Sequence, residues 1–513
     1  MRNFRWQVLY RRDPAWIPSL LAIFLIVTLG AVFWVGYQGS DDGSYIDAAQ
    51  GWLRDFPHLG HSHWSLRYPI VLPIAASLAL LGQTVIAVVL PFMLAFTGTA
   101  LITVWAMVRR LGQPEAMVFV LLFLTLPGAL VLATFVSDDI MELFLVIASL
   151  MLFLAAERAA RRWPFAVASG FCTGLAFLTR ETSAGLILTY GMLFLIRPGI
   201  PRRFYVLMGA AFCAIVFAQT AFIAAMTGDW LYRFHIDATH DVVHRAAVVT
   251  HALAVGHVID NQGNLVVSAA LDPILMFLVS QKYGLAFYLG IAGCTLLFRR
   301  QLHRAERSLL VATVVLGVTW SAFIVANQHF LYLVPRYILV PAWCACVLGG
   351  ALIGRWWREG RRWLAGLALG AALAVNLAAL LVENTDPIQS SKASLIAASK
   401  AREPVWTDPI TARRGRFLRR IEGLDGRLRA GPPPRGALFA YAPDDVARCT
   451  HSPECGMTSI PYTPQPGWMV VERDIPAPRP FGLLLRATGL ALPPQLWQKI
   501  VQPNAGIILY RTN

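Results

Sequence analysis

Residues 16–45 read WIPSLLAIFLIVTLGAVFWVGYQGSDDGSY, an apolar run that gives way to a polar, acidic segment. The apolar part, Trp16 to Tyr37, is long enough to cross a bilayer, which takes about 20 helical residues. Arginines precede this run, and it lacks the small-residue cleavage site of a signal peptide before Gln38. We therefore interpret it as a retained first span whose N-terminus lies in the cytoplasm.

The rest of the chain continues this pattern. Of its 513 residues, 57% are hydrophobic and 14% are charged, whereas about 25% are charged in an ordinary soluble domain. This composition excludes a disordered chain and indicates a polytopic membrane protein with eleven net crossings. Further apolar runs lie near 68–108, which is long enough for two helices, and near 116–136, 140–156, 164–178, 184–196, 204–227, 274–298, 307–326, 337–354 and 363–382.

The net charge of +15 indicates either a nucleic-acid partner or the positive-inside bias of a membrane protein. The turns between alternate runs carry +15, whereas the loops at the other ends of the runs carry −7. The charge therefore reports membrane topology, and we expect no nucleic-acid partner. The loops assigned to the outer face are 38–67, 137–142, 179–183, 228–273 and 327–336.

Candidate functional side chains gather on these outward loops. Each has a structural alternative: a solvated helix end, a polar turn, a local ion pair or an interfacial aromatic belt. Carboxylates this close to hydrocarbon are costly unless water, a metal or a basic partner accompanies them. The segments in question are Ser40 to Tyr45, His61 to Pro69, Ser137-Asp138-Asp139 and Thr179-Arg180-Glu181.

The order of these segments resembles the GT-C membrane glycosyltransferases that use polyprenyl-phosphate sugars. The branch with the lipid A aminoarabinose transferase and the protein O-mannosyltransferases is the most similar, over roughly residues 15–345. Two features depart from the pattern, because Arg67 stands two residues before Pro69 instead of adjacent to it, and Arg180 replaces the usual lysine. The matching motifs are Asp41-Asp42 with Tyr45, Arg67 with Pro69, Asp138, the stretch GLAFLTR at 174–180, and Arg336-Tyr337 with Pro341.

The resemblance implies that Asp41 is the catalytic base of an inverting sugar transfer. It implies an acidic site at Asp42, Asp138 and Asp139, which would shape the cavity, orient the acceptor or hold a divalent cation. Among the arginines that could bind the donor phosphate, we favour Arg180, because it lies at the depth of a lipid phosphate. The other candidates are Arg67, Arg245 and Arg336 for phosphate, and Tyr45, His63, His244 and Tyr337 for substrate binding.

We expect a GT-C fold: an all-α polytopic membrane domain of about 11–13 helices over residues 1–382, followed by a small extracytoplasmic α/β domain over 383–513. In the tail, strands are predicted at 404–408, 436–441, 467–474 and 506–511, a basic helix at 410–421, and a disulfide between Cys449 and Cys455. The expected location is the cytoplasmic membrane of a bacterium. The alternatives are a lipid-linked sugar transporter or flippase, and a glycan polymerase or ligase. The sequence leaves the sugar and the acceptor open.

Overall fold

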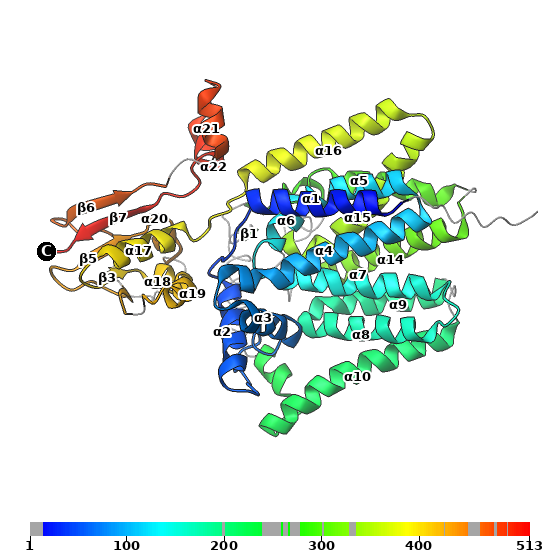
Figure 1. The fold of residues 1–513 in the computed structure, drawn as a ribbon, viewed down its shortest axis with the longest axis horizontal. Coiled ribbons are helices and arrows are strands. Elements are labelled where there is room, and N and C mark those ends of the chain that lie inside the picture. Colours follow the sequence, from blue (N-terminus) through cyan, green and yellow to red (C-terminus); the bar gives the residue numbers. More distant parts are fainter. Residues whose placement is uncertain are drawn as a thin grey trace, which may run out of the picture. The chain divides into compact units, whose positions relative to one another are not determined.

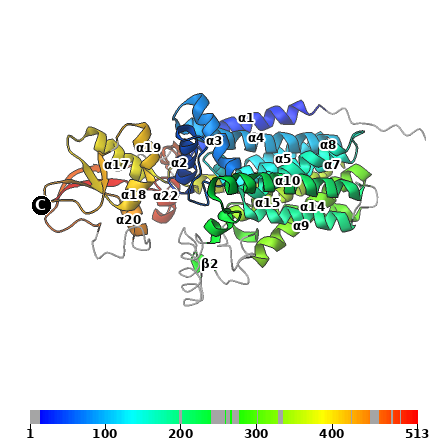
Figure 2. The same cartoon turned by 90° about the horizontal axis from the view of Figure 1, so that it is seen from below.

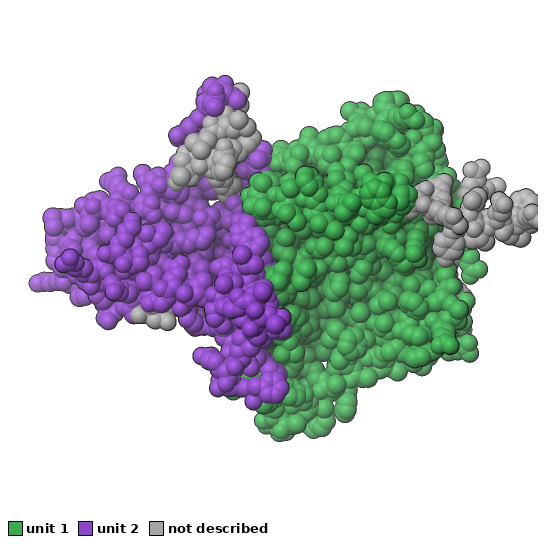
Figure 3. Space-filling model, in the orientation of Figure 1, with its two compact units in different colours: residues 1–33, 57–73, 90–380 green, residues 34–56, 74–89, 381–513 purple. Residues whose placement is uncertain are grey.

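The structure, a computed structural model, describes residues 14–196, 201–238, 258–259, 265–266, 277–299, 302–327, 335–424, 426–449, 462–476, 480–489 and 491–513. The chain forms two compact units, coloured separately in Figure 3. Unit 1 comprises residues 1–33, 57–73 and 90–380, and unit 2 comprises residues 34–56, 74–89 and 381–513. Unit 2 thus combines the N-terminal part of the first outward loop and residues 74–89 with the C-terminal tail.

Unit 1 is a bundle of helices. Figures 1 and 2 both show α5, α7, α14 and α15 side by side within it. Helices α3 (Tyr68–Leu81) and α4 (Val85–Arg110) each contribute residues to both units. The other helices are α1 (Trp16–Val32), α5 (Gln113–Leu124), α6 (Pro127–Ala133), α7 (Asp138–Ala156), α8 (Trp163–Thr179), α9 (Ala184–Ile196), α10 (Arg202–Thr227), α13 (Ala286–Cys294), α14 (Arg304–Ala326), α15 (Leu339–Arg358) and α16 (Arg362–Val382).

The lengths and compositions of these helices confirm the predicted all-α membrane architecture. In the described part of the chain, six helices are long and apolar enough to span a bilayer, and five shorter ones are apolar. The predicted run 68–108 is indeed two helices, α3 and α4. The run at 116–136 is instead broken, because α5 and α6 meet at an angle of 70°. Pro127 starts α6, and a proline there cannot continue the hydrogen bonding of the preceding helix.

Helices α7 and α15 form the centre of the bundle. In their most apolar stretches, 83% and 94% of the residues are buried, against 17% in α10. Close packing of α15 depends on glycine: a Cβ added to Gly354 would lie 2.6 Å from the Cα of Glu115 on α5. Small residues let membrane helices approach this closely. The acidic start of α7 therefore belongs to the most buried helix layer.

Unit 2 contains a five-stranded mixed sheet in the order β4-β3-β5-β7-β6. Strand β3 (Val405–Thr407) pairs in parallel with β4 (Leu428–Ala430) and β5 (Leu438–Tyr441), whereas β7 (Ile507–Arg511) is antiparallel to β5 and β6 (Met469–Asp474). The predicted small α/β fold is therefore confirmed, with β4 as an additional strand. The helices of unit 2 are α2 (Asp41–Arg54), α17 (Gln389–Lys400), α18 (Pro409–Arg414), α19 (Arg416–Ile421), α20 (Pro443–Cys449), α21 (Pro480–Ala487) and α22 (Pro494–Ile500).

Two features of the helices in unit 2 bear on the candidate site. Helix α2 begins at Asp41, so Asp41 and Asp42 lie in its first turn and not in a free loop. The single basic helix expected at 410–421 is two short helices, α18 and α19, separated at Gly415.

Candidate active site

Unit 1 holds a cluster of charged side chains at the start of α7, which we call the arginine–acid cluster. Asp138 and Asp139 form the first turn of α7, where the helix dipole favours negative charge. Arg180 directly follows α8, and Arg336 belongs to a short 3-10 helix, Pro335–Ile338, that precedes α15. The members of the cluster are Arg67, Asp138, Asp139, Arg180, Glu181, Arg233 and Arg336.

Guanidinium groups surround the two aspartates. Arg67 Nη1 lies 2.8 Å from Asp138 Oδ2, and Arg180 Nε lies 3.9 Å from the same oxygen. Arg180 Nη1 also donates a hydrogen bond to Asp139 Oδ1, and Arg336 Nε lies 3.8 Å from Asp139 Oδ2. Charge-assisted bonds of this kind are stronger than neutral ones and fix the geometry of both partners. The aspartates therefore hold three arginines from distant parts of the sequence in one place.

The arginines of the cluster differ in exposure. The Arg180 side chain is 6% exposed, and its guanidinium group stacks over the ring of Tyr337 at 4.1 Å from the centroid. The Arg336 side chain is 38% exposed. Arg180 is therefore enclosed by the protein, whereas Arg336 presents much of its surface outward. Of the two side chains, that of Arg336 is therefore the more accessible.

Further polar contacts link the other members of the cluster to its surroundings. Arg233 Nη2 donates to Glu181 Oε1 at 2.5 Å, and Arg67 Nη2 lies 3.3 Å from Glu181 Oε2. Glu142, one turn into α7, accepts hydrogen bonds from Thr182 Oγ1 at 2.5 Å and Ser183 Oγ at 2.7 Å. These bonds tie the segment after α8 to the start of α7.

Asp42, in unit 2, organises the backbone before α2. Its Oδ2 accepts hydrogen bonds from the N–H groups of Gln38 (2.6 Å) and Gly39 (3.2 Å), and its Oδ1 from those of Ser40 (2.6 Å) and Gly43 (3.0 Å). The residue is 1% exposed. Burial raises the pKa of the Asp42 carboxyl group, and the four N–H groups oppose this rise because they favour its ionised form. Asp42 is therefore a loop-shaping residue.

Replacing Asp42 by asparagine is expected to destabilise unit 2 by about 1–3 kcal/mol. The amide NH2 group would face two backbone N–H donors, whichever way the side chain is turned, because each carboxylate oxygen accepts two such bonds. Thermal unfolding of the purified protein measures the effect. Asp55→Asn is the control, since Asp55 is an exposed residue at the end of α2. Equal stability of the two variants would contradict the role assigned to Asp42.

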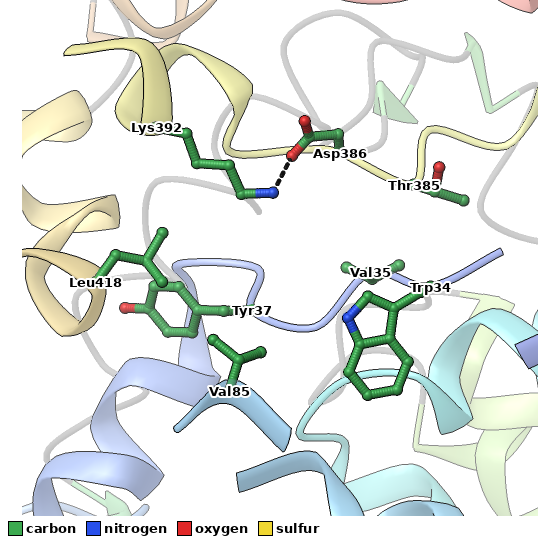
Figure 4. A pocket seen from close by; sticks show the side chains of 8 residues that line it. All are labelled: Trp34, Val35, Tyr37, Val85, Thr385, Asp386, Lys392 and Leu418. Carbon is green, nitrogen blue, oxygen red and sulfur yellow. Dashed lines mark hydrogen bonds and ion pairs between the residues drawn. The ribbon is translucent and has the colours of Figure 1, made fainter. Parts of the chain in front are cut away.

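A cavity of about 350 Å³ lies within unit 2, beside the segment that leads into α2. Figure 4 shows the rings of Trp34 and Tyr37 on its wall. Lys392 and Asp386 also line the cavity and form an ion pair, with 2.6 Å between Nζ and Oδ1. The remaining lining residues are Val35, Val85, Thr385 and Leu418. The cavity is thus built jointly by residues 34–37, the start of α4 and the tail.

The structure brings together six of the residues that the sequence singled out: Arg67, Asp138, Asp139, Arg180, Arg336 and Tyr337. Asp41, Asp42 and Tyr45 lie on α2 in unit 2, where Tyr45 is 1% exposed and packs in the core. The ring of His63 packs on that of Trp64, with 3.9 Å between centroids. His244, Arg245 and Cys455 lie outside the described residues, so their predicted roles stay predictions.

Sequence reasoning missed Arg233 and Glu142 as members of this polar network. Arg233 lies on an outward loop near a membrane boundary, the same signal that singled out Arg67. Glu142 lies one turn after the aspartate pair on α7, the spacing at which helical side chains share a face. Both signals were available in the sequence.

The predicted acidic residues do not fit a divalent cation. Asp42 uses both of its oxygens for backbone N–H groups, and guanidinium groups approach the oxygens of Asp138 and Asp139. Over the ranges that the structure covers, no group of three or more His, Cys, Asp or Glu side chains could hold a metal ion.

The chain is similar to known proteins in part of its sequence and in its fold. Residues 69–223 match the family described as dolichyl-phosphate-mannose-protein mannosyltransferase. No curated protein sequence matches the chain. ArnT from Cupriavidus metallidurans in the apo state is similar in structure, with a TM-score of 0.54 and 13% identity over 96% of this chain and 98% of ArnT.

Two further solved structures have comparable similarity. ArnT from Cupriavidus metallidurans bound to undecaprenyl phosphate has a TM-score of 0.52 and 13% identity, over 90% of this chain and 96% of that one. The Archaeoglobus fulgidus oligosaccharyltransferase in complex with Zn and sulfate has a TM-score of 0.51 and 16% identity, over 82% of this chain and 62% of that one.

The fold and the length of its apolar helices define the class, a multi-pass helical membrane protein. More specifically, the chain has the GT-C fold, so the fold that its motifs predicted is confirmed.

Proposed function

We propose that this protein is an integral-membrane glycosyltransferase. It moves a sugar from a polyprenyl-phosphate donor to a lipid, glycan or protein acceptor on the outer face of a bacterial cytoplasmic membrane. The GT-C fold and the undecaprenyl phosphate bound to one similar structure support this assignment. The charge bias of the loops supports a cytoplasmic N-terminus and an extracytoplasmic tail.

The observation that carries the proposal is the arginine–acid cluster. A leaving polyprenyl phosphate gains negative charge as the sugar departs, and preorganised cations stabilise that charge in the transition state. Asp138 and Asp139 hold Arg180 and Arg336 in place, and Arg336 is partly exposed. We therefore assign phosphate binding to Arg336 and the organisation of the site to Arg180, which revises the preference for Arg180 drawn from the sequence.

In the proposed reaction, Asp41 accepts the proton of an acceptor hydroxyl as its oxygen attacks the anomeric carbon of the donor. The bond between the anomeric carbon and the phosphate oxygen breaks, and polyprenyl phosphate leaves with the electron pair. This single displacement inverts the anomeric centre. Asp41 lies partly buried at the first position of α2, with its backbone position defined by the bonds of Asp42.

Replacing Arg336 by alanine is expected to lower kcat/KM for the donor about 10–100-fold, because charge-assisted bonds to an anion are worth about 1.5–3 kcal/mol and strengthen as the phosphate leaves. The KM for the acceptor should change little. Purified protein with an undecaprenyl-phosphate sugar supplies the assay. Arg299→Ala is the matched control, since Arg299 is 37% exposed and paired with Glu359. A normal donor kcat/KM in Arg336→Ala would remove this residue from the phosphate site.

The same preparation distinguishes the two alternative functions. In proteoliposomes, a transporter or flippase would move the lipid-linked sugar across the bilayer without forming a glycosidic bond. A glycan polymerase or ligase would require a donor carrying several sugars instead of one. We expect transfer of a single sugar and no flux in the absence of an acceptor.

A further inference from the structure

Helix α2 is joined to the tail by ion pairs and hydrogen bonds. Both oxygens of Asp47 are paired, Oδ2 with Arg416 Nη2 and Oδ1 with Arg420 Nη1 at 3.2 Å. Arg420 Nη1 also donates a hydrogen bond to Gln50 Oε1. Asp47 and Gln50 are three residues apart on α2, and the two arginines are four apart on α19, so each pair shares one helix face. The two helices thus meet along a polar seam.

A buried layer lies behind this seam. The ring of Tyr37 packs against that of Phe417 on α19, with 5.3 Å between centroids, and both residues are at most 3% exposed. A Cβ added to Gly43, in the first turn of α2, would lie 3.1 Å from the Tyr37 hydroxyl oxygen. The first turn of α2 therefore rests on an aromatic pair that the tail completes.

The backbone before α2 is held by the tail as well. Arg414 on α18 forms a buried ion pair with Asp445 at 2.6 Å, and its Nη2 donates to the carbonyl oxygen of Gln38 at 3.3 Å. Gly39 has a φ of +70°, and a Cβ there would lie 2.6 Å from the Arg414 carbonyl oxygen, so only glycine fits. The backbone before Asp41 is thus tied to α18, and the helix that follows it is tied to α19.

We propose that α18 and α19 form a clamp that fixes α2, and with it Asp41, in one orientation. Arg416 and Arg420 are its positioning residues. Their side chains and that of Asp47 are 35–40% exposed, and partly exposed ion pairs add little to overall stability. Their effect is on the direction in which α2 presents its first turn. The tail is therefore a working part of the active site, and the catalytic part of this inference rests on the proposed function.

The clamp can be tested without a substrate by hydrogen–deuterium exchange of the full-length protein. In the double variant Arg416→Met/Arg420→Met, we expect the amides of residues 41–54 to exchange about tenfold faster, because local opening of α2 becomes easier. The matched control is Arg427→Met/Arg429→Met. It removes the same charge from the tail, where Arg427 donates to the Ala401 carbonyl and Arg429 lies over the Trp406 ring. Unchanged exchange of α2 in the first variant would overturn the clamp.

The positioning role is tested by sugar transfer with an undecaprenyl-phosphate sugar. Misplacement of a catalytic group by about 1 Å can cost about 100-fold in rate. We expect kcat to fall about 10–100-fold in Arg416→Met/Arg420→Met while the donor KM and the melting temperature stay close to those of the control.

Reversal of the charges, Asp47→Arg with Arg416→Glu and Arg420→Glu, should restore both protection and kcat. Faster exchange with an unchanged kcat would overturn the positioning role. A wild-type protein without transfer activity would refute the proposed function instead, and the exchange experiment would still decide the clamp.

Discussion

Asp41→Asn is expected to lower the rate of sugar transfer by about 1000-fold, within the range that a general base contributes. Asparagine has nearly the same shape but cannot accept the proton of the attacking hydroxyl. The change should leave the fold intact, because Asp42 and not Asp41 accepts the four hydrogen bonds that shape the preceding loop. Initial rates with an undecaprenyl-phosphate sugar and a defined acceptor measure the effect.

The comparison that matters is with Asp55→Asn, which removes one exposed carboxylate from the other end of α2. That variant should transfer sugar at the wild-type rate. Donor binding, measured separately, should be equal in all three proteins, because Asp41 acts on the acceptor. Near-normal transfer by Asp41→Asn would disprove its assignment as the base.

Arg180→Met is expected to destabilise unit 1 by about 3–5 kcal/mol, the usual cost of removing one partner from a buried ion pair. Methionine fills part of the space but leaves Asp139, which is 3% exposed, without its hydrogen bond from Arg180. It also removes the cation that stacks on Tyr337. Thermal unfolding in detergent, followed by the loss of monodisperse protein, measures the change.

Two further variants separate charge from geometry at this position. Arg180→Lys keeps the charge but loses the planar guanidinium group, so an intermediate loss of stability is expected. Arg336→Met should cost less than Arg180→Met, because the Arg336 side chain is 38% exposed. If Arg180→Met unfolded at the wild-type temperature, the organising role of Arg180 in the cluster would be wrong.

Much of the membrane fold could be predicted from the sequence, because a helix that crosses a bilayer must be a long apolar run. Each apolar run of the sequence corresponds to one or two apolar helices of the structure. The break between α5 and α6 could not be placed from the apolar run alone, since residues 116–136 contain no charged side chain that would mark a turn. Pro127 was a visible signal, but prolines within α3 and α4 leave those helices unbroken. Whether a helix breaks at a proline or continues through it therefore depends on how the helix packs.

Part of the candidate site could also be predicted, from the positions of its charged residues. Arg67, Asp138, Arg180 and Arg336 stand out because charges at a membrane boundary are costly and need partners. Their pairing was not predictable, because it depends on how α7, α8 and the start of α15 pack. The role of Asp42 was also hidden, since its partners are backbone N–H groups that no residue type reveals. Hydrogen bonds from the backbone to a side chain become visible only in the folded structure.

The composition of unit 2 has a consequence for how this protein is made. Residues 34–56 leave the ribosome long before residues 381–513, which complete their packing. At about 5–20 residues per second, the delay is roughly 15–65 seconds. During synthesis α2 therefore waits for α18 and α19. A chain that stops before α18 would retain its membrane helices yet lack Arg416 and Arg420, the partners of Asp47, so α2 would be held in place only after α19 is translated.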